Sequence, residues 1–84
     1  MIELLKYITQ NITGDTRIKI EEQNAGDLTI YTIKTPKEVM GMLIGKEGRT
    51  IRAIRTLART RAIVDGAKIA VELEEVAEGS GIKN

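Results

Sequence analysis

The chain has 84 residues, an apolar share of 42% and a formal net charge of +1. This length allows one domain with a modest core, which must be aliphatic because Phe and Trp are absent. The absence of Cys and His excludes disulfides, thiolate metal sites and His-based catalytic triads. Apolar runs fall far short of the roughly 20 residues of a membrane helix. The start also lacks a signal-peptide pattern, so we expect a cytoplasmic protein without a membrane partner.

The first half of the sequence predicts one helix and two strands. Apolar residues recur at helical spacing over positions 1–12, and Gly14 provides a terminator. The residues of this apolar face are Met1, Leu4, Leu5, Ile8 and Ile12. Charged and apolar residues alternate over 16–22, and positions 28–35 are rich in Thr, Ile and Tyr, so both segments suit strands. Between them, the polar residues and glycine of positions 23–27 indicate a hairpin loop.

A second pair of helices is predicted next. The sequence Thr-Pro-Lys-Glu at 35–38 has the form of a capping box, in which Thr35 caps the helix and Glu38 returns the bond. This helix must stop near Gly45. Another helix then runs from about residue 49 to about residue 64. Its expected core stripe consists of Ile51, Ile54, Leu57, Ala58 and Ala62.

A last strand completes the predicted order. Apolar residues alternate with Ala and Glu over positions 69–74. The following residues are charged and contain glycine, with little to bury. We therefore predict one α+β domain over residues 1–76, in the order helix, strand, strand, helix, helix, strand, and a flexible tail over 77–84.

Positive charge is concentrated in one segment. Residues 46–61 hold six basic residues against one acidic residue, so this segment carries +5 while the rest of the chain carries −4. Arg52, Arg55 and Arg59 lie on one side of the predicted helix, without an acidic residue near them in sequence. A helix built only for stability would mix charges for i,i+4 pairing. The stripe therefore favours contact with a polyanion over a purely solvated face.

The interval between the two helices reads Gly45-Lys46-Glu47-Gly48. Its glycines permit left-handed backbone and close approach of a ligand, and the next helix presents free N–H groups there. A phosphate would find these donors with the charge of Lys46 and Arg49 beside them. Glu47 is the discordant residue, and it either points away from the ligand or contacts the helix start. Taken alone, G-x-x-G more often marks only a tight turn between helices. Its charge, its position between two predicted helices and the arginine stripe that follows favour the binding interpretation.

The segment from Ile44 to Ile51, IGKEGRTI, resembles the I-G-x-x-G-x-x-I signature of KH domains. The element order resembles the type II KH fold, α-β-β-α-α-β, a three-stranded mixed sheet packed on one side by helices. Length and the stretch 45–58 are similar to the small bacterial single-KH proteins of the KhpA family. This resemblance covers about residues 1–76. It implies a groove for about four single-stranded nucleotides, a homodimer, and a larger KH-containing RNA-binding partner.

The same resemblance implies the site. The four residues of the loop would clamp the RNA backbone, with Arg49 and Arg52 as phosphate neighbours. Met42 and Ile44 would contribute to an aliphatic floor for the bases. Ile51 is a further candidate for the floor, although ordinary core packing is the favoured interpretation for it. The candidate nucleic-acid-binding residues are Met42, Ile44, Gly45, Lys46, Glu47, Gly48, Arg49, Arg52, Arg55 and Arg59.

We predict a non-enzymatic protein, without cofactor or metal, that binds single-stranded RNA with little sequence selectivity. It would serve as an RNA chaperone or post-transcriptional regulator. Two alternatives remain. Glu47 and the low total charge favour a KH-fold interaction module that has lost RNA binding. Single-stranded DNA is the other possible ligand, because no residue of the loop obviously requires a 2′-OH.

Overall fold

The computed structural model describes residues 1–76 and places them in the predicted order. The elements are α1 (Ile2–Thr13), β1 (Lys19–Ala25), β2 (Leu28–Pro36), α2 (Lys37–Ile44), the 3₁₀ turn η1 (Lys46–Gly48), α3 (Arg49–Asp65) and β3 (Lys68–Val76). No helix among residues 1–76 is long and apolar enough to span a membrane. The predicted tail at 77–84 lies outside the described residues, so the domain boundary stays a prediction.

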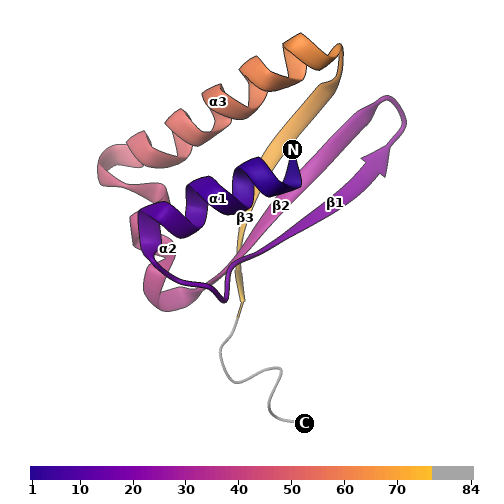
Figure 1. Ribbon diagram of the computed structural model, residues 1–84. Coiled ribbons are helices and arrows are strands. Elements are labelled where there is room, and N and C mark those ends of the chain that lie inside the picture. The colour runs from indigo at the N-terminus through magenta and orange to yellow at the C-terminus, as the bar shows by residue number, and fades with distance from the viewer. Residues whose placement is uncertain (77–84) are drawn as a thin grey trace, which may run out of the picture.

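The strands form one mixed sheet in the order β1-β2-β3. β1 runs antiparallel to β2, and β3 runs parallel to β2. The parallel pairing requires a crossover connection, which α2 and α3 supply. Helices α1 and α3 cross the same face of the sheet (Figure 1). Within the described part of the chain β2 is therefore central, while β1 and β3 are edge strands.

The hairpin loop is shorter than predicted. Residues 23–25 belong to β1 and pair with residues 28–30, so only Gly26 and Asp27 form the turn. β1 also begins at Lys19 rather than at position 16. All of its residues except Ile20 are exposed. Polar residues are ordinary on such an exposed edge strand. Because this composition is also typical of a loop, residues 23–25 were wrongly predicted as part of one.

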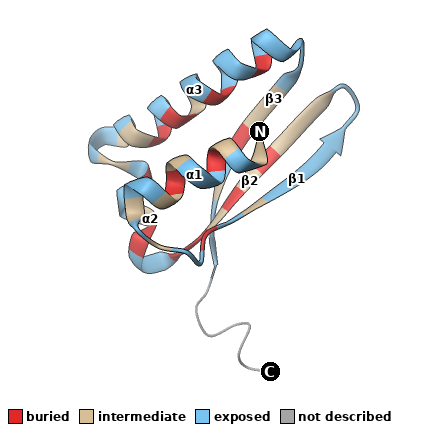
Figure 2. Cartoon of the chain, viewed as in Figure 1, coloured by how far each residue is buried: buried red, intermediate tan, exposed pale blue. Residues whose placement is uncertain are grey.

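The hydrophobic core lies between the helices and the inner face of the sheet (Figure 2). The buried cluster consists of Leu5, Ile18, Tyr31, Ile33, Leu43, Ile51, Ile54, Ala58 and Val71. Leu57 was predicted in the stripe of α3 but is 53% exposed, since it lies about 100° around the helix from Ala58, on the side away from the sheet. Ile12 is likewise exposed at the end of α1, and Thr9 is buried instead.

The predicted cap at Thr35 is wrong. Thr35 is still part of β2, where it pairs with Glu75 of β3, and the residue that caps α2 is Pro36, which makes no side-chain cap bond. The Thr35 side chain is fully buried, and its hydroxyl has no hydrogen-bond partner among residues 1–76. The carboxylate of Glu38 lies 3.4 Å from Nη1 of Arg17. Strand pairing with β3 therefore overrode the local helix-start pattern.

Candidate nucleic-acid interface

The loop between α2 and α3 depends on glycine at its first position. Gly45 has φ 75° and ψ 175°, a conformation that essentially only glycine adopts. A Cβ on Gly45 would also lie 2.8 Å from the backbone nitrogen of Thr50. Gly48 has φ 75° and ψ 16°, but a Cβ there would meet nothing within 4 Å. Both glycines therefore serve backbone conformation, and Gly45 additionally permits close packing against the start of α3.

Glu47 also adopts a left-handed conformation, with φ 58° and ψ 27°. It is the sole non-glycine residue with positive φ among residues 1–76. Its carbonyl oxygen accepts a hydrogen bond of 3.0 Å from Nη2 of Arg52. Its carboxylate lies 3.8 Å from Nη2 of Arg49, with both side chains well exposed. Glu47 thus contacts the first turn of α3, which is one of the two alternatives that the sequence analysis gave for this side chain.

The start of α3 has no side-chain cap. Gly48 is its N-cap residue and has no side chain to accept the first N–H groups. The Gly48 N–H donates to the Gly45 carbonyl at 3.1 Å, which tightens the turn. Lys46 is exposed and, within residues 1–76, makes no ion pair. Backbone donors, the positive end of the helix dipole and the Lys46 ammonium group therefore occur together at this loop.

Backbone carbonyls hold two of the three arginines of the stripe in place. Arg52 donates to Glu47, as described above, and Nε of Arg55 donates to the Val71 carbonyl at 3.0 Å. Arg59 has no hydrogen-bond or ion-pair partner in the described part of the chain. Arg61 differs from all three because its Nε lies 3.2 Å from the carboxylate of Asp65. Carbonyls orient a guanidinium without neutralising it, so the stripe keeps its charge.

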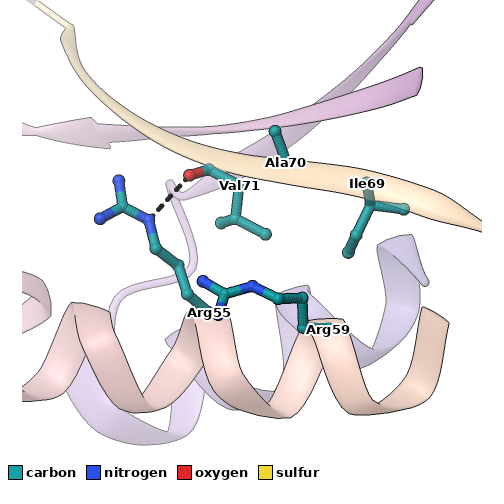
Figure 3. Close-up of a pocket in the computed structure, with 5 residues that line it drawn as sticks. All are labelled: Arg55, Arg59, Ile69, Ala70 and Val71. Carbon is teal, nitrogen blue, oxygen red and sulfur yellow. Dashed lines mark hydrogen bonds between the residues drawn. The ribbon is translucent and has the colours of Figure 1, made fainter. Parts of the chain in front are cut away.

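A cleft lies between α3 and the edge strand β3. Arg55, Arg59, Ile69, Ala70 and Val71 line this cleft, whose volume is about 200 Å³ (Figure 3). The sequence predicted the two arginines but not the three strand residues. β3 is recognised as an edge strand only from the order of strands in the sheet, and no sequence pattern reveals that order. The one sequence signal for the contact between α3 and β3 was the expected parallel crossover, which packs the connecting helix against the strand that follows it.

The three candidate floor residues separate into two groups. Met42 is 51% exposed and Ile44 is 39% exposed, so both offer apolar surface near the end of α2 that leads into the loop. Ile51 is 8% exposed and belongs to the core cluster. The favoured interpretation of Ile51 as a core residue is confirmed.

The perturbed pKa values lie in other parts of the molecule. Hydrogen bonds from Arg17, together with its charge, lower the pKa of the Asp15 carboxyl. Burial and the nearby carboxylates of Glu22 and Asp65 raise the pKa of Tyr31. Neither titrating side chain belongs to the loop or to α3. Residues 1–76 also contain no group of three or more side chains able to hold a metal ion.

Comparison with known proteins identifies relatives over nearly the whole chain. The RNA-binding protein KhpA of Chlamydia trachomatis is 38% identical over 76 residues, which cover 89% of this chain and 97% of that protein. The protein of the same name from Clostridium perfringens is 32% identical over 74 residues, covering 87% and 99%. Ribonuclease Y of Treponema pallidum is 39% identical over 70 residues, which cover 82% of this chain but 12% of that enzyme.

The fold has a counterpart among solved structures. Aquifex aeolicus Era bound to GDP·AlF4− superposes with a TM-score of 0.61 and 19% identity, covering 90% of this chain and 30% of that chain. At this identity the likeness concerns the fold alone. The family described as KhpA/KhpB, KH domain, matches residues 2–78. The helix and strand order and the mixed sheet confirm the expected type II KH fold. This chain therefore belongs to the KhpA/KhpB KH-domain family.

Proposed function

We propose that this chain binds single-stranded RNA and holds the phosphate backbone at the loop Gly45–Gly48. The observation that carries the proposal is the geometry of the loop. Its first position has no room for a side chain, and the helix that follows begins without a side-chain cap. Relatives covering nearly all of this chain are named RNA-binding proteins, which supports the same conclusion. We further propose that the protein acts in the cytoplasm as an RNA chaperone or post-transcriptional regulator.

The loop and the first turn of α3 would supply the phosphate contacts. Lys46 adds a charge with no partner among the described residues, and Arg52 adds one held at the loop by the Glu47 carbonyl. Arg49 adds less, because the Glu47 carboxylate lies 3.8 Å from it. These groups recognise the backbone rather than the base sequence, so we expect low selectivity from the clamp.

Apolar side chains beside the clamp would contact the bases. Met42 and Ile44 are both exposed and provide an aliphatic surface at the end of α2. The chain lacks Phe and Trp, so strong stacking of the kind seen on aromatic platforms is not available. A single groove of this chemistry should therefore bind weakly.

Useful affinity would come from two linked grooves. The outer side of α3 exposes Leu57, Ile63 and Val64, the last two at 75% and 78%. We propose that a second copy of this chain covers this apolar face, so that both grooves bind one RNA by increased effective concentration. A larger KH-containing protein could supply the second groove in the same way.

The test is RNA binding by a variant of the clamp. Lys46→Asp combined with Glu47→Asp replaces the positive charge at position 46 by a negative one, so that the loop carries two acidic residues. Asp at position 47 also tolerates the left-handed backbone there. The variant should lose at least about tenfold in affinity for a single-stranded oligomer, since a phosphate contact is replaced by repulsion. Lys6→Asp on α1 makes the same charge change at Lys6 as the variant makes at Lys46, and it serves as the matched control.

Salt dependence and competition complete the test. Neutralising about three phosphates on a single strand predicts a slope near −2 in a plot of log affinity against log salt. Equal binding by wild type and clamp variant, or no binding by either at low salt, would contradict the clamp. Absence of binding by both proteins would favour the alternative of an interaction module that has lost RNA binding, which the acidic Glu47 also supports. Competition between matched RNA and DNA oligomers separates the two nucleic acids.

A further inference from the structure

Lys46 combines an exposed ammonium group with basic surroundings. It makes no ion pair within residues 1–76, whereas the ammonium group of Lys68 lies 3.8 Å from the carboxylate of Asp27. Exposure without an acidic partner leaves the Lys46 nitrogen accessible to small molecules in solvent. Lysine is the residue that acetylation modifies, and the reaction removes its charge. Lys46 is therefore a candidate for covalent modification, and its surroundings decide which acyl donor reaches it.

Two guanidinium groups lie at the same loop. Nη2 of Arg52 donates to the Glu47 carbonyl at 3.0 Å, which holds this charge at the loop. Arg49 directly follows the loop, and the Glu47 carboxylate 3.8 Å from its Nη2 offsets part of the charge there. Residues 46–52 thus hold three basic side chains against one acidic side chain, a net charge of +2. Such a patch concentrates a small anion, and it does so more strongly the higher the charge of the anion.

Lys6 on α1 provides the comparison within the same molecule. It is exposed as well, and it makes no ion pair among the described residues. Its helix carries no arginine, and Glu3 lies about one turn before it. Lys6 therefore has the accessibility of Lys46 without the positive surroundings. A difference between the two lysines in their reactivity toward an anionic reagent reports those surroundings.

An acyl phosphate has the properties that this patch selects. It is a small dianion with an activated acyl group, whereas a neutral acyl donor would distinguish lysines by access alone. In the reaction, the deprotonated amine of Lys46 forms a bond to the carbonyl carbon, and the bond between that carbon and the phosphate oxygen breaks. The phosphate leaves with the electron pair. Of the two protons that the ammonium group loses, one goes to solvent and one to the departing phosphate, so the products are a neutral amide and hydrogen phosphate.

We propose that Lys46 is an acylation site for acyl phosphates, which Arg49 and Arg52 attract to the loop, and that this modification weakens the binding of RNA. The inference rests on the proposed RNA clamp and adds a mode of regulation to it. Because the amide product is neutral and Glu47 remains, residues 46 and 47 change from no net charge to a net negative charge. An RNA phosphate at the loop then loses a cationic partner and keeps an acidic neighbour.

The first experiment maps acetylation by mass spectrometry after incubation of the full chain with acetyl phosphate. Lys46 should be modified about sevenfold faster than Lys6, the factor by which a potential of about kT/e concentrates a dianion. High salt should remove most of this preference, because it screens an exposed patch. The N-hydroxysuccinimide ester of acetate is neutral and should modify the two lysines at rates within about twofold of each other. A saturating single-stranded RNA oligomer should protect Lys46 and leave Lys6 reactive.

The second experiment measures RNA binding by the full chain acetylated at a single lysine, with the acetylated residue introduced during translation. Protein acetylated at Lys46 should bind a single-stranded oligomer about fivefold more weakly than unmodified protein, since it loses one phosphate contact. The slope of log affinity against log salt should become less steep by about 0.7, the value of one contact on a single strand. Protein acetylated at Lys6 is the matched control and should bind within about twofold of unmodified protein. Circular dichroism verifies that each protein is folded.

The outcomes distinguish the two proposals. Equal rates at Lys46 and Lys6 with acetyl phosphate, or a preference for Lys46 that the neutral ester shares, would overturn the acylation site. Unchanged RNA affinity after acetylation of Lys46 would overturn its regulatory role. If the variant with Lys46→Asp and Glu47→Asp still loses affinity in either case, the clamp stands and only the acylation proposal fails. Absence of RNA binding by unmodified protein at low salt would contradict the clamp together with its regulation, and mass spectrometry would still decide whether Lys46 is the preferred site.

Discussion

Replacing Gly45 by Ala tests whether the loop geometry is as constrained as the structure indicates. Two separate costs apply to this position. The conformation at φ 75° and ψ 175° belongs to a region that costs about 1–3 kcal/mol for residues other than glycine. The added Cβ would also lie 2.8 Å from the backbone nitrogen and 2.7 Å from the Cβ of Thr50, and relieving such overpacking costs about 1–3 kcal/mol.

These costs are partly offset, because Ala restricts the unfolded chain by about 0.4–1 kcal/mol relative to Gly. We therefore expect Gly45→Ala to lower the free energy of unfolding by about 3 kcal/mol, and Tm by about 12–24 °C for a domain of this size. Gly48→Ala is the matched control, because its Cβ would meet nothing within 4 Å. The left-handed conformation alone should cost it about 1 kcal/mol.

Urea denaturation followed by circular dichroism measures both variants against the wild type. If Gly45→Ala and Gly48→Ala differ by less than about 0.5 kcal/mol, the argument from close packing against Thr50 is wrong. Adding Thr50→Ala to Gly45→Ala removes the hydroxyl but leaves the backbone nitrogen at 2.8 Å. The double variant should therefore recover less than half of the loss, and a full recovery would show that the hydroxyl alone is the obstacle.

Four further changes have defined outcomes. Glu47→Asn should raise Tm by a few degrees, since Asn tolerates φ near 58°, and should strengthen RNA binding by removing the acidic group. Weaker binding would contradict the proposed phosphate contact at the loop. Thr35→Val should stabilise the fold by about 1 kcal/mol in urea denaturation, because it removes a buried hydroxyl without a partner in residues 1–76. Asp15→Asn should reduce the pH dependence of the free energy of unfolding at acid pH. Arg17 lowers the pKa of Asp15 in the folded state, so the wild type has this stabilisation above the ordinary pKa of about 3.9. It loses the stabilisation as the pH falls through the lower folded-state pKa. Val64→Glu should shift sedimentation toward the monomer without changing the far-ultraviolet spectrum, and an unchanged mass would place any self-association elsewhere.

Periodicity predicted the order of elements because core-facing residues must recur at the period of the element that carries them. It failed where pairing between strands decided the structure. The local pattern at Thr35 is a good helix start, yet β3 pairs with β2 through Pro36 and extends the strand past the expected cap. The exposed residues of β1 could likewise be recognised as strand only from their pairing with β2. Both failures concern long-range partners, which a local pattern does not contain.

The candidate site likewise has one part that local sequence predicted and one part that depends on long-range contacts. The loop was predictable because its sequence, Gly-Lys-Glu-Gly, is contiguous and its helices flank it directly. The cleft at Arg55 and Arg59 was not, because its other wall comes from β3, about fifteen residues later in the chain. The sequence placed charge on α3 correctly but held no information on which strand would face that charge.

The arginines of α3 differ in the kind of partner that orders their side chains. Acidic partners reduce the charge at Arg49 and Arg61, at the two ends of the helix. Arg52 and Arg55 instead donate to carbonyl oxygens, which fix the direction of the guanidinium and leave its full charge in place. A helix that only needed solvation would gain nothing from holding Arg52 and Arg55 this way, since exposed arginines lose conformational freedom when ordered. These two arginines therefore present ordered positive charge, which lowers the entropic cost of binding a polyanion there.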